Sequence, residues 1–468
     1  MKEGLFKEFS PVSSKEWKQR IQYDLKGSDY QSSVVTKTEE GVLIKPFYHR
    51  DEYKSVDDRI RGGTFKIAES VFIDKENIAA NIAIKALQTG ADTIFWKAKA
   101  PFKAKLLAEL LRKEQGLKAA EFHFDLGFLD EDFIKELSAA FHEYSIYLHL
   151  DILGNLVKTG NWFSNNKKDH EILIRLLTTL PDSCHVMGVD ASLYQNSGAT
   201  IIQQLAYALA QGNEYLNHLF QLKQEGIIDN KVWLRAVREL HFTFAVGGDF
   251  FFEIAKLQSF RVLWKHLTEA YEIDEPIKIS VKPTLRNKTI YDYNVNLIRT
   301  STECMAAIIG GADTICNISY DTIFKKSNDF GNRISRNQLV ILKEESHIKN
   351  GDYFNGTYFL ESLRTEFSQK ALEIFKEIEK GGGFADQIYK GTIQRKIAES
   401  NEASMKNFDE GSLALLGSNK FPNPSDKMKE SLELNPFLPH RDTQTEVIPV
   451  IPKRLAEMYK KNRLKEEK

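Results

Sequence analysis

The clearest pattern along the chain is a regular alternation of short hydrophobic runs with longer segments of helical periodicity. The sixth helical segment shows it best, because Leu257, Phe260 and Trp264 recur at the three- and four-residue spacing of one helix face. The intervening helices are predicted at residues 77–90, 102–114, 131–144, 170–180, 200–221 with 231–240, 249–271, 291–311 and 329–346. Eight hydrophobic runs predict strands at residues 65–73, 92–98, 119–126, 146–153, 184–192, 241–248, 277–284 and 313–321.

Strict alternation of strands and helices is typical of a parallel sheet, and eight is the number of strands that closes a barrel. The sequence therefore predicts an α/β protein with a (β/α)8 TIM barrel over residues 61–350. Residues 1–60 predict an N-terminal arm, because they hold only short structured stretches between polar ones. Two more helical patterns predict a C-terminal helical extension at 351–414, and the polar, proline-bearing residues 415–468 predict an extended tail.

Composition excludes several classes of function. Lys and Arg number 64 and Asp and Glu 65, so no overall field attracts nucleic acid or an anionic membrane. The three cysteines, Cys184, Cys304 and Cys316, form no C-x-x-C pair, which favours buried thiols in a reducing compartment over a zinc site. No signal-like N-terminal segment and no run of 18 apolar residues occurs. We therefore expect a soluble cytoplasmic protein that binds neither nucleic acid nor a membrane.

Two strands place polar residues inside the predicted barrel, where functional groups lie at the carboxyl ends of the strands. The apolar residues of these strands must face the helices, which leaves His123 and Asp125, and then His149 and Asp151, pointing inward. Two His-x-Asp pairs can bind a divalent metal and activate water, as in barrel hydrolases. They can also form a polar layer in which carboxylates hold the imidazoles. We favour the layer and expect no metal, because further ligands are missing from the right strands.

The seventh predicted strand adds a positive charge to the same interior. Lys282 points inward by the same parity, and can either meet an anionic ligand or neutralise Asp125, Asp151 and Asp190. Residues 247–249, Gly-Gly-Asp, offer backbone N–H groups at a helix N-terminus, which indicates either an anion site or a tight turn. No glycine-rich nucleotide loop and no serine-hydrolase elbow occurs in the sequence.

Several segments resemble the methylmalonyl-CoA mutase family in the same order along the chain. The strongest is RTSTECMAAIIGGADTICNISYD from residue 299, followed by DFGNRISRNQLVILKEES from residue 329. The resemblance extends over roughly residues 189–411 and implies the family's reaction, the adenosylcobalamin-dependent radical conversion of methylmalonyl-CoA to succinyl-CoA. Further similar segments are SGATIIQQLAYALAQGNEYL at 197–216, DFFFEIAKLQSFRVLW at 249–264 and GTYFLESLRTEFSQKALEIFKEIEKGGG at 356–383.

The residues on which that chemistry depends differ in this chain. Ser192 and Leu193 stand where the family has a Tyr-His pair at the thioester, and leucine cannot donate a hydrogen bond to a carbonyl. The family's Gln in a CQTSG segment falls at Lys282, whereas Gln195 and Glu303 match family positions. A flavodoxin-like domain with the cobalt-ligating D-x-H-x-x-G motif is not expected, because only about 50 residues follow the last predicted helix.

This combination resembles the small, β-type subunit of the heterodimeric bacterial enzyme. It implies a complex in which a catalytic large subunit binds adenosylcobalamin, while this chain stabilises the complex and is itself inactive. Two alternatives stay open. One is a barrel subunit of a related acyl-CoA mutase that borrows cobalamin from a separate chain, and the other is the metal-dependent hydrolase. We expect no catalytic residue, and we expect vestigial mouth positions at Gln195, Glu303, Lys282, Asp190, His123, Asp125, His149 and Asp151.

Overall fold

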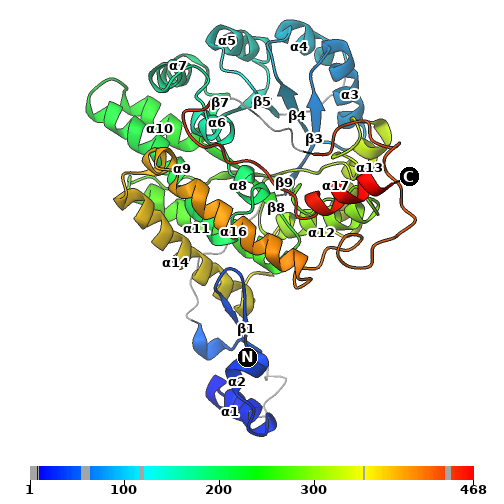
Figure 1. The fold of residues 1–468 in the computed structure, drawn as a ribbon. Helices are drawn as coiled ribbons and strands as arrows, with labels where there is room; N and C mark the ends of the chain where they lie inside the picture. Colours follow the sequence, from blue (N-terminus) through cyan, green and yellow to red (C-terminus); the bar gives the residue numbers. More distant parts are fainter. Residues whose placement is uncertain are drawn as a thin grey trace.

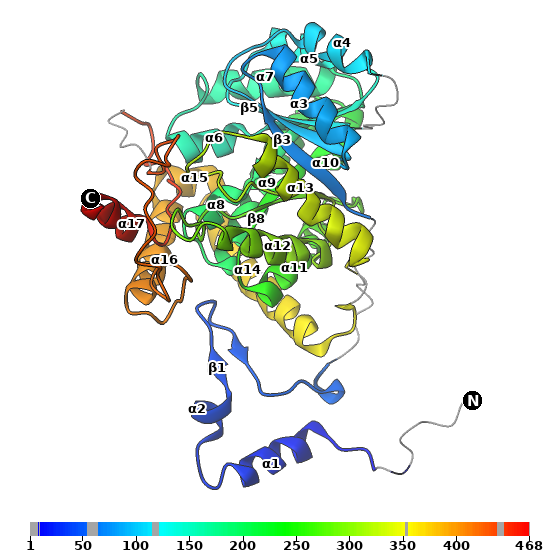
Figure 2. The ribbon, with the colours of Figure 1, turned by 90° about the vertical axis from the view of Figure 1, so that its right-hand side faces the viewer.

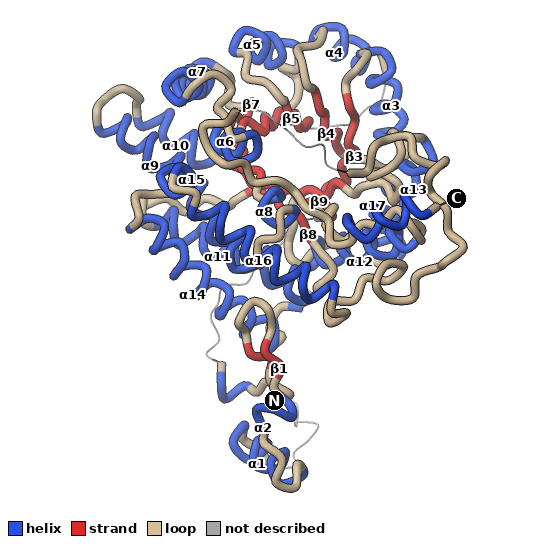
Figure 3. Tube along the Cα trace, in the orientation of Figure 1, coloured by secondary structure: helices blue, strands red, loops and turns tan. Residues whose placement is uncertain are grey.

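The centre of the molecule is a closed barrel of eight parallel strands in the order β10-β3-β4-β5-β6-β7-β8-β9. Figures 1 and 3 show the barrel viewed from one end. The computed structural model describes residues 8, 10–53, 64–114, 121–351, 354–437 and 444–467. The prediction of a (β/α)8 barrel is therefore confirmed. Its strands are β3 (Lys66–Phe72), β4 (Thr93–Ala98), β5 (Glu121–Leu126), β6 (Ser145–Leu150), β7 (Cys184–Asp190), β8 (His241–Val246), β9 (Lys278–Pro283) and β10 (Thr314–Cys316).

Helices surround the barrel on its outside (Figure 1). Along α11, Leu257, Phe260 and Trp264 are buried, as the three- and four-residue spacing predicts. Residues 119 and 120, at the start of the third predicted strand, lie outside the described residues. The helices of this layer are α3 (Glu76–Gln88), α4 (Ala104–Arg112), α5 (Glu131–Ala140), α6 (Ile152–Thr159), α7 (Asn166–Thr179), α8 (Ser192–Asn196), α9 (Ile201–Gln224), α10 (Asn230–Glu239), α11 (Phe250–Glu269), α12 (Val295–Ile309) and α13 (Asp329–Val340), which continues as the π-helix η2 (Ile341–Glu345).

Two strands end three or more residues earlier than their hydrophobic runs predict. β6 ends at Leu150 because Asp151 is the N-cap of α6, where its Oδ1 accepts the N–H of Gly154 at 2.7 Å. β10 ends at Cys316 because the side chain of Asn317 binds the N–H of Ile318 and the carbonyl of Ser335. Hydrophobic runs cannot mark such ends, since a first helical turn is as apolar as the strand before it.

The N-terminal arm stands away from the barrel, as Figure 2 shows. Its helix α1 has no buried residue, and Trp17 on this helix stacks on Phe47 with ring centroids 5.0 Å apart. The arm meets the body through a small hairpin whose Val42 is fully buried. The elements of the arm are α1 (Ser14–Asp24), α2 (Tyr30–Val34), β1 (Thr36–Lys37), β2 (Leu43–Ile44) and the 3-10 helix η1 (Arg50–Glu52).

The C-terminal part packs on the same body. Helix α14 (Tyr358–Lys380) lies against α9 and α11, and is followed by α15 (Phe384–Tyr389) and α16 (Thr392–Asp409). Beyond them the tail is not extended throughout, because Glu457–Glu466 forms helix α17. We call residues 444–467 the strap. It crosses the carboxyl end of the barrel (Figure 1), where Val450 N donates to Val157 O at 2.8 Å and Lys453 N to Asn196 O at 2.8 Å.

No helix within the described residues is both long and apolar enough to cross a lipid bilayer.

Candidate functional site

The inside of the barrel is filled by stacked rings. Phe95 stacks on His123 with centroids 4.8 Å apart, His123 on Tyr147 at 4.8 Å, and Tyr147 on His185 at 4.2 Å. His241 meets Tyr147 edge-on at 5.4 Å. Burial lowers the pKa of His123, that of His185 to about 4 and that of His241 to about 3, so all three imidazoles are neutral at pH 7. The interior is therefore a packed aromatic core, as is usual for barrels of this kind.

The two predicted His-x-Asp pairs form no metal site, and neither imidazole is held by the aspartate of its own pair. A carboxylate does reach the layer, but it is Glu121, whose Oε1 lies 3.5 Å from His123 Nε2. The structure brings His123 and His149 together, with Nδ1 of the first 3.0 Å from Nε2 of the second. Asp151 instead caps α6 and accepts hydrogen bonds from Asp190 N at 2.9 Å and the hydroxyl of Tyr215 at 2.8 Å. Burial raises the pKa of Asp151 to about 6. In the described part of the chain, no three His, Cys, Asp or Glu side chains are grouped so as to hold a metal ion.

Above the ring layer lie two lysines. Lys282 Nζ sits 4.2 Å from the centroid of the Phe95 ring, which is a cation–π contact rather than a contact with a predicted carboxylate. Lys97, which the sequence reasoning missed, lies nearby. Burial lowers the pKa of Lys97, and the positive charge of Lys282 adds to this, while Asp125 and Asp190 favour its charged form. Lys97 is the penultimate residue of β4 and follows three apolar residues, and this change of polarity is the sequence signal that could have revealed it.

The positions that carry the family's Tyr-His pair lie at the end of β7 and the start of α8. Ser192 donates its hydroxyl to Asp190 Oδ1 at 2.5 Å, and its backbone N–H lies 3.2 Å from the same oxygen. Leu193 is buried among apolar side chains of the core. This corner therefore offers an incoming carbonyl group no side-chain donor from residue 193.

Gln195 belongs to a buried cluster that joins α8, α9 and α11. Its Nε2 donates to Glu253 Oε1 at 2.7 Å, and its Oε1 accepts from Lys256 Nζ at 3.0 Å. Lys256 also forms an ion pair with Glu253 and donates to Ala245 O at 2.7 Å. Burial lowers the pKa of Lys256, and the adjacent Glu253 carboxylate opposes this shift. The sequence analysis missed both charged residues, although a Glu and a Lys three positions apart on an apolar helix face signal a buried pair.

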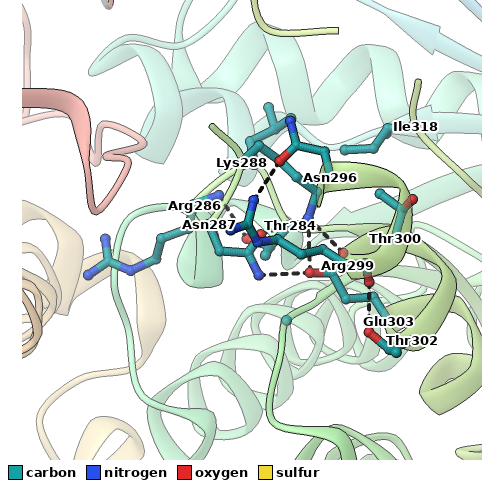
Figure 4. A network of polar contacts seen from close by, with 12 residues as sticks. Thr284, Arg286, Asn287, Lys288, Asn296, Arg299, Thr300, Thr302, Glu303 and Ile318 are labelled. Atoms are coloured by element: carbon teal, nitrogen blue, oxygen red, sulfur yellow. Dashed lines mark hydrogen bonds and ion pairs between the residues drawn. The ribbon is translucent and has the colours of Figure 1, made fainter. Parts of the chain in front are cut away.

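Glu303 forms a second buried ion pair at the mouth, shown in Figure 4. Lys288 Nζ lies 2.7 and 2.9 Å from its two carboxylate oxygens, and Asn287 Nδ2 donates to Oε1 at 2.8 Å. Burial raises the pKa of Glu303 and lowers that of Lys288, and each charge opposes the shift of the other. Lys460 of α17 donates to the carbonyl of Lys288 at 2.8 Å. The pair therefore fixes the loop after β9 and, through it, the strap.

A cleft of about 210 Å³ remains at the mouth, between the N-termini of α9 and α11 and the loop after β9. Glu40 of the N-terminal hairpin reaches into it and accepts the N–H groups of Ile201 at 2.7 Å and Ile202 at 3.1 Å. Burial raises the pKa of Glu40 to about 7. The sequence predicts free backbone N–H groups in the Gly-Gly-Asp turn before α11. One of them, the N–H of Gly247, donates to Glu253 Oε1 at 2.8 Å. The cleft is thus lined mainly by groups that already bind one another.

Comparison with known proteins shows the family to which this chain is similar. The family described as methylmalonyl-CoA mutase matches residues 134–465. The chain is 31% identical to the methylmalonyl-CoA mutase small subunit of Porphyromonas gingivalis over 90% of this chain and 72% of that protein. It is 30% identical to the small subunit of Streptomyces virginiae over 59% of this chain and 44% of that one. It is also 30% identical to the methylmalonyl-CoA mutase of Rhizobium meliloti over 48% of this chain and 32% of that protein.

Fold and mouth together define a (β/α)8 barrel protein whose carboxyl end holds buried ion pairs and is crossed by its own strap. Within that class, the chain belongs to the methylmalonyl-CoA mutase family, an isomerase family.

Proposed function

We propose that this chain is the non-catalytic small subunit of a heterodimeric methylmalonyl-CoA mutase and that it stabilises a catalytic large subunit. The observation that carries the proposal is that two acidic residues of the mouth, Glu253 and Glu303, are each bound to a buried lysine. Leu193 supports the proposal too. It stands at the family's His position, and its side chain cannot donate a hydrogen bond to the thioester carbonyl. Similarity to two small subunits supports the same assignment.

The cofactor that the family implies, adenosylcobalamin, does not fit the residues at this mouth. A corrinoid needs an open face on which to bind, but the strap crosses the mouth. The imidazoles of His123, His149, His185 and His241 are engaged in the ring layer below it. We therefore propose that the large subunit binds the cofactor and carries out the isomerisation.

The N-terminal arm is the contact surface that we propose for the large subunit. It projects from the body (Figure 2), and it exposes 47% of Trp17 and 76% of Tyr23. Exposed aromatic side chains supply much of the binding energy at protein interfaces. The strap is a second proposed contact, because Ile448 remains 69% exposed while its neighbour Val447 is buried against the barrel.

The direct test is to mix the purified chain with the large subunit and to measure complex formation by light scattering after gel filtration. We expect a 1:1 complex, and we expect Trp17→Ala combined with Tyr23→Ala to weaken it at least about tenfold, or 1.4 kcal/mol. Ile227→Ala, at a 61% exposed position before α10, is the matched control and should leave the affinity unchanged. Failure of the unmodified chains to associate would refute the proposal.

The alternative of a barrel that catalyses with cobalamin borrowed from a separate chain makes a different prediction. It requires turnover of an acyl-CoA when this chain is mixed with a free cobalamin-binding domain. The buried Leu193 and the engaged Gln195 argue against it.

A further inference from the structure

The hairpin of the arm places a carboxylate at a helix N-terminus inside the mouth. Glu40 Oε1 and Oε2 accept the N–H groups of Ile201 and Ile202, the first two residues of the 24-residue helix α9. The first N–H groups of a helix have no partner within the helix, and their dipoles attract anions. In this position Glu40 has the role that a bound anion has at other helix N-termini.

The guanidinium of Arg286, in the same cleft, has one nitrogen that lacks an acceptor. Arg286 is only 9% exposed, and its Nη1 donates to Asn401 Oδ1 at 2.8 Å and to Lys453 O at 3.0 Å. Its Nη2 is buried and has no hydrogen-bond partner among the described residues. Burial lowers the pKa of Arg286 to about 10, so the guanidinium is still charged at pH 7. In Figure 4 this side chain extends away from the Lys288–Glu303 pair. A buried charged donor without an acceptor is costly, and a bound oxyanion would remove that cost.

Three carboxylates besides Glu253 line the cleft, and two of them belong to the hairpin. Glu39 and Glu40 both line the cleft from this hairpin, whereas Glu253 is neutralised by Lys256. Asp249 also lines the cleft, and burial raises its pKa to about 6. If the hairpin withdraws, two carboxylates leave with it. The α9 N-terminus and the Arg286 guanidinium then remain as donors around a space sized for a small ion.

We propose that this cleft is a binding site for a small oxyanion, a phosphate or a carboxylate group, which binds to the α9 N-terminus and Arg286 in exchange for Glu40. Binding of the anion is thereby coupled to release of the hairpin, and hence to the position of the arm. The coupling is reciprocal, because a partner that holds the arm away from the cleft strengthens anion binding by the same factor. This site is independent of the assignment as a small subunit.

The test is isothermal titration calorimetry on the full chain, with inorganic phosphate and, in a separate series, acetate, at an ionic strength held constant with sodium chloride. Removing the internal competitor by Glu40→Ala should tighten oxyanion binding at least about tenfold relative to the unmodified chain. Asp24→Ala is the matched control, because it removes a carboxylate of the same arm that contacts Arg20 and does not line the cleft, and it should bind within about twofold of the unmodified chain. Adding Arg286→Gln to Glu40→Ala should abolish the gain.

The two series identify the ligand, since tighter binding of phosphate or of acetate indicates a phosphate or a carboxylate ligand respectively. Trypsin cleavage after Lys37 in β1 reports release of the hairpin, and should accelerate when the preferred anion is added to the unmodified chain. If Glu40→Ala disturbs the fold by circular dichroism, Glu40→Gln replaces it, because this side chain keeps its size and loses its charge. Equal affinity of the Glu40 variant and the unmodified chain for both anions would overturn the proposal.

Discussion

The barrel interior and the barrel mouth bury polar groups in opposite ways. In the interior, imidazoles are buried as neutral rings that stack on Phe95 and Tyr147. At the mouth, full charges are buried as the pairs Lys288–Glu303 and Lys256–Glu253. A neutral ring costs little to bury but resists protonation, whereas a buried ion pair does not tolerate the loss of one partner. We therefore expect the mouth to be destabilised by mutation of a pair partner and the interior to be destabilised by acid.

The largest expected effect comes from breaking a pair at the mouth. Lys288→Met leaves Glu303 buried without its cation, and should lower the free energy of unfolding by about 3–5 kcal/mol. Urea unfolding at pH 7 measures the change. Replacing both partners, in Lys288→Met with Glu303→Leu, should recover most of the loss. A double variant as unstable as the single one would show that the pair is needed for more than mutual neutralisation.

The interior should respond to acid. The pKa of His185 is lowered to about 4 and that of His241 to about 3, so between these values and the ordinary value of 6.5 the unfolded chain binds more protons than the folded one. The contribution of these histidines to the free energy of unfolding is then fully present above pH 6.5 and is lost on acidification, by about 1.4 kcal/mol per pH unit for each such histidine. Urea titrations between pH 7 and pH 4 measure the slope, and His241→Phe should reduce it. His142→Gln, at an exposed position, is the control that should not.

The smallest expected effect on stability concerns Lys282, which lies between the ring layer and the mouth. Lys282→Met removes the cation that Lys282 places over the Phe95 ring, and should cost about 1 kcal/mol. Lys278→Met, on the exposed first residue of the same strand, should cost less than half of this. Thermal melting under identical conditions compares them. Equal losses would mean that the ring contact contributes nothing specific.

The fold could be read from the sequence because strand and helix periodicities are local properties of the chain. The inward orientation of His123, His149 and Lys282 also follows from local alternation, and the structure places all three inside the barrel. What each group binds does not follow from local pattern. Local alternation predicts that Asp151 faces the lumen beside His149. Strand β6 ends at Leu150, however, so the Asp151 carboxylate caps α6 instead.

The contacts at the mouth join residues that are far apart in the chain. Glu40 meets Ile201 across 161 positions, and Lys460 meets the carbonyl of Lys288 across 172. A single sequence holds no local signal for such contacts. The part played by the arm hairpin and the strap at the mouth could therefore be found only in the folded structure.

The central claim is that this barrel supports catalysis without performing it. The most direct measurement is conversion of methylmalonyl-CoA, with adenosylcobalamin present, by this chain alone, by the large subunit alone and by their 1:1 mixture. We expect no turnover by this chain alone, and in the mixture a rate that is sustained longer than that of the large subunit alone. Turnover by this chain alone, abolished by Gln195→Ala in a variant that still folds, would contradict the account.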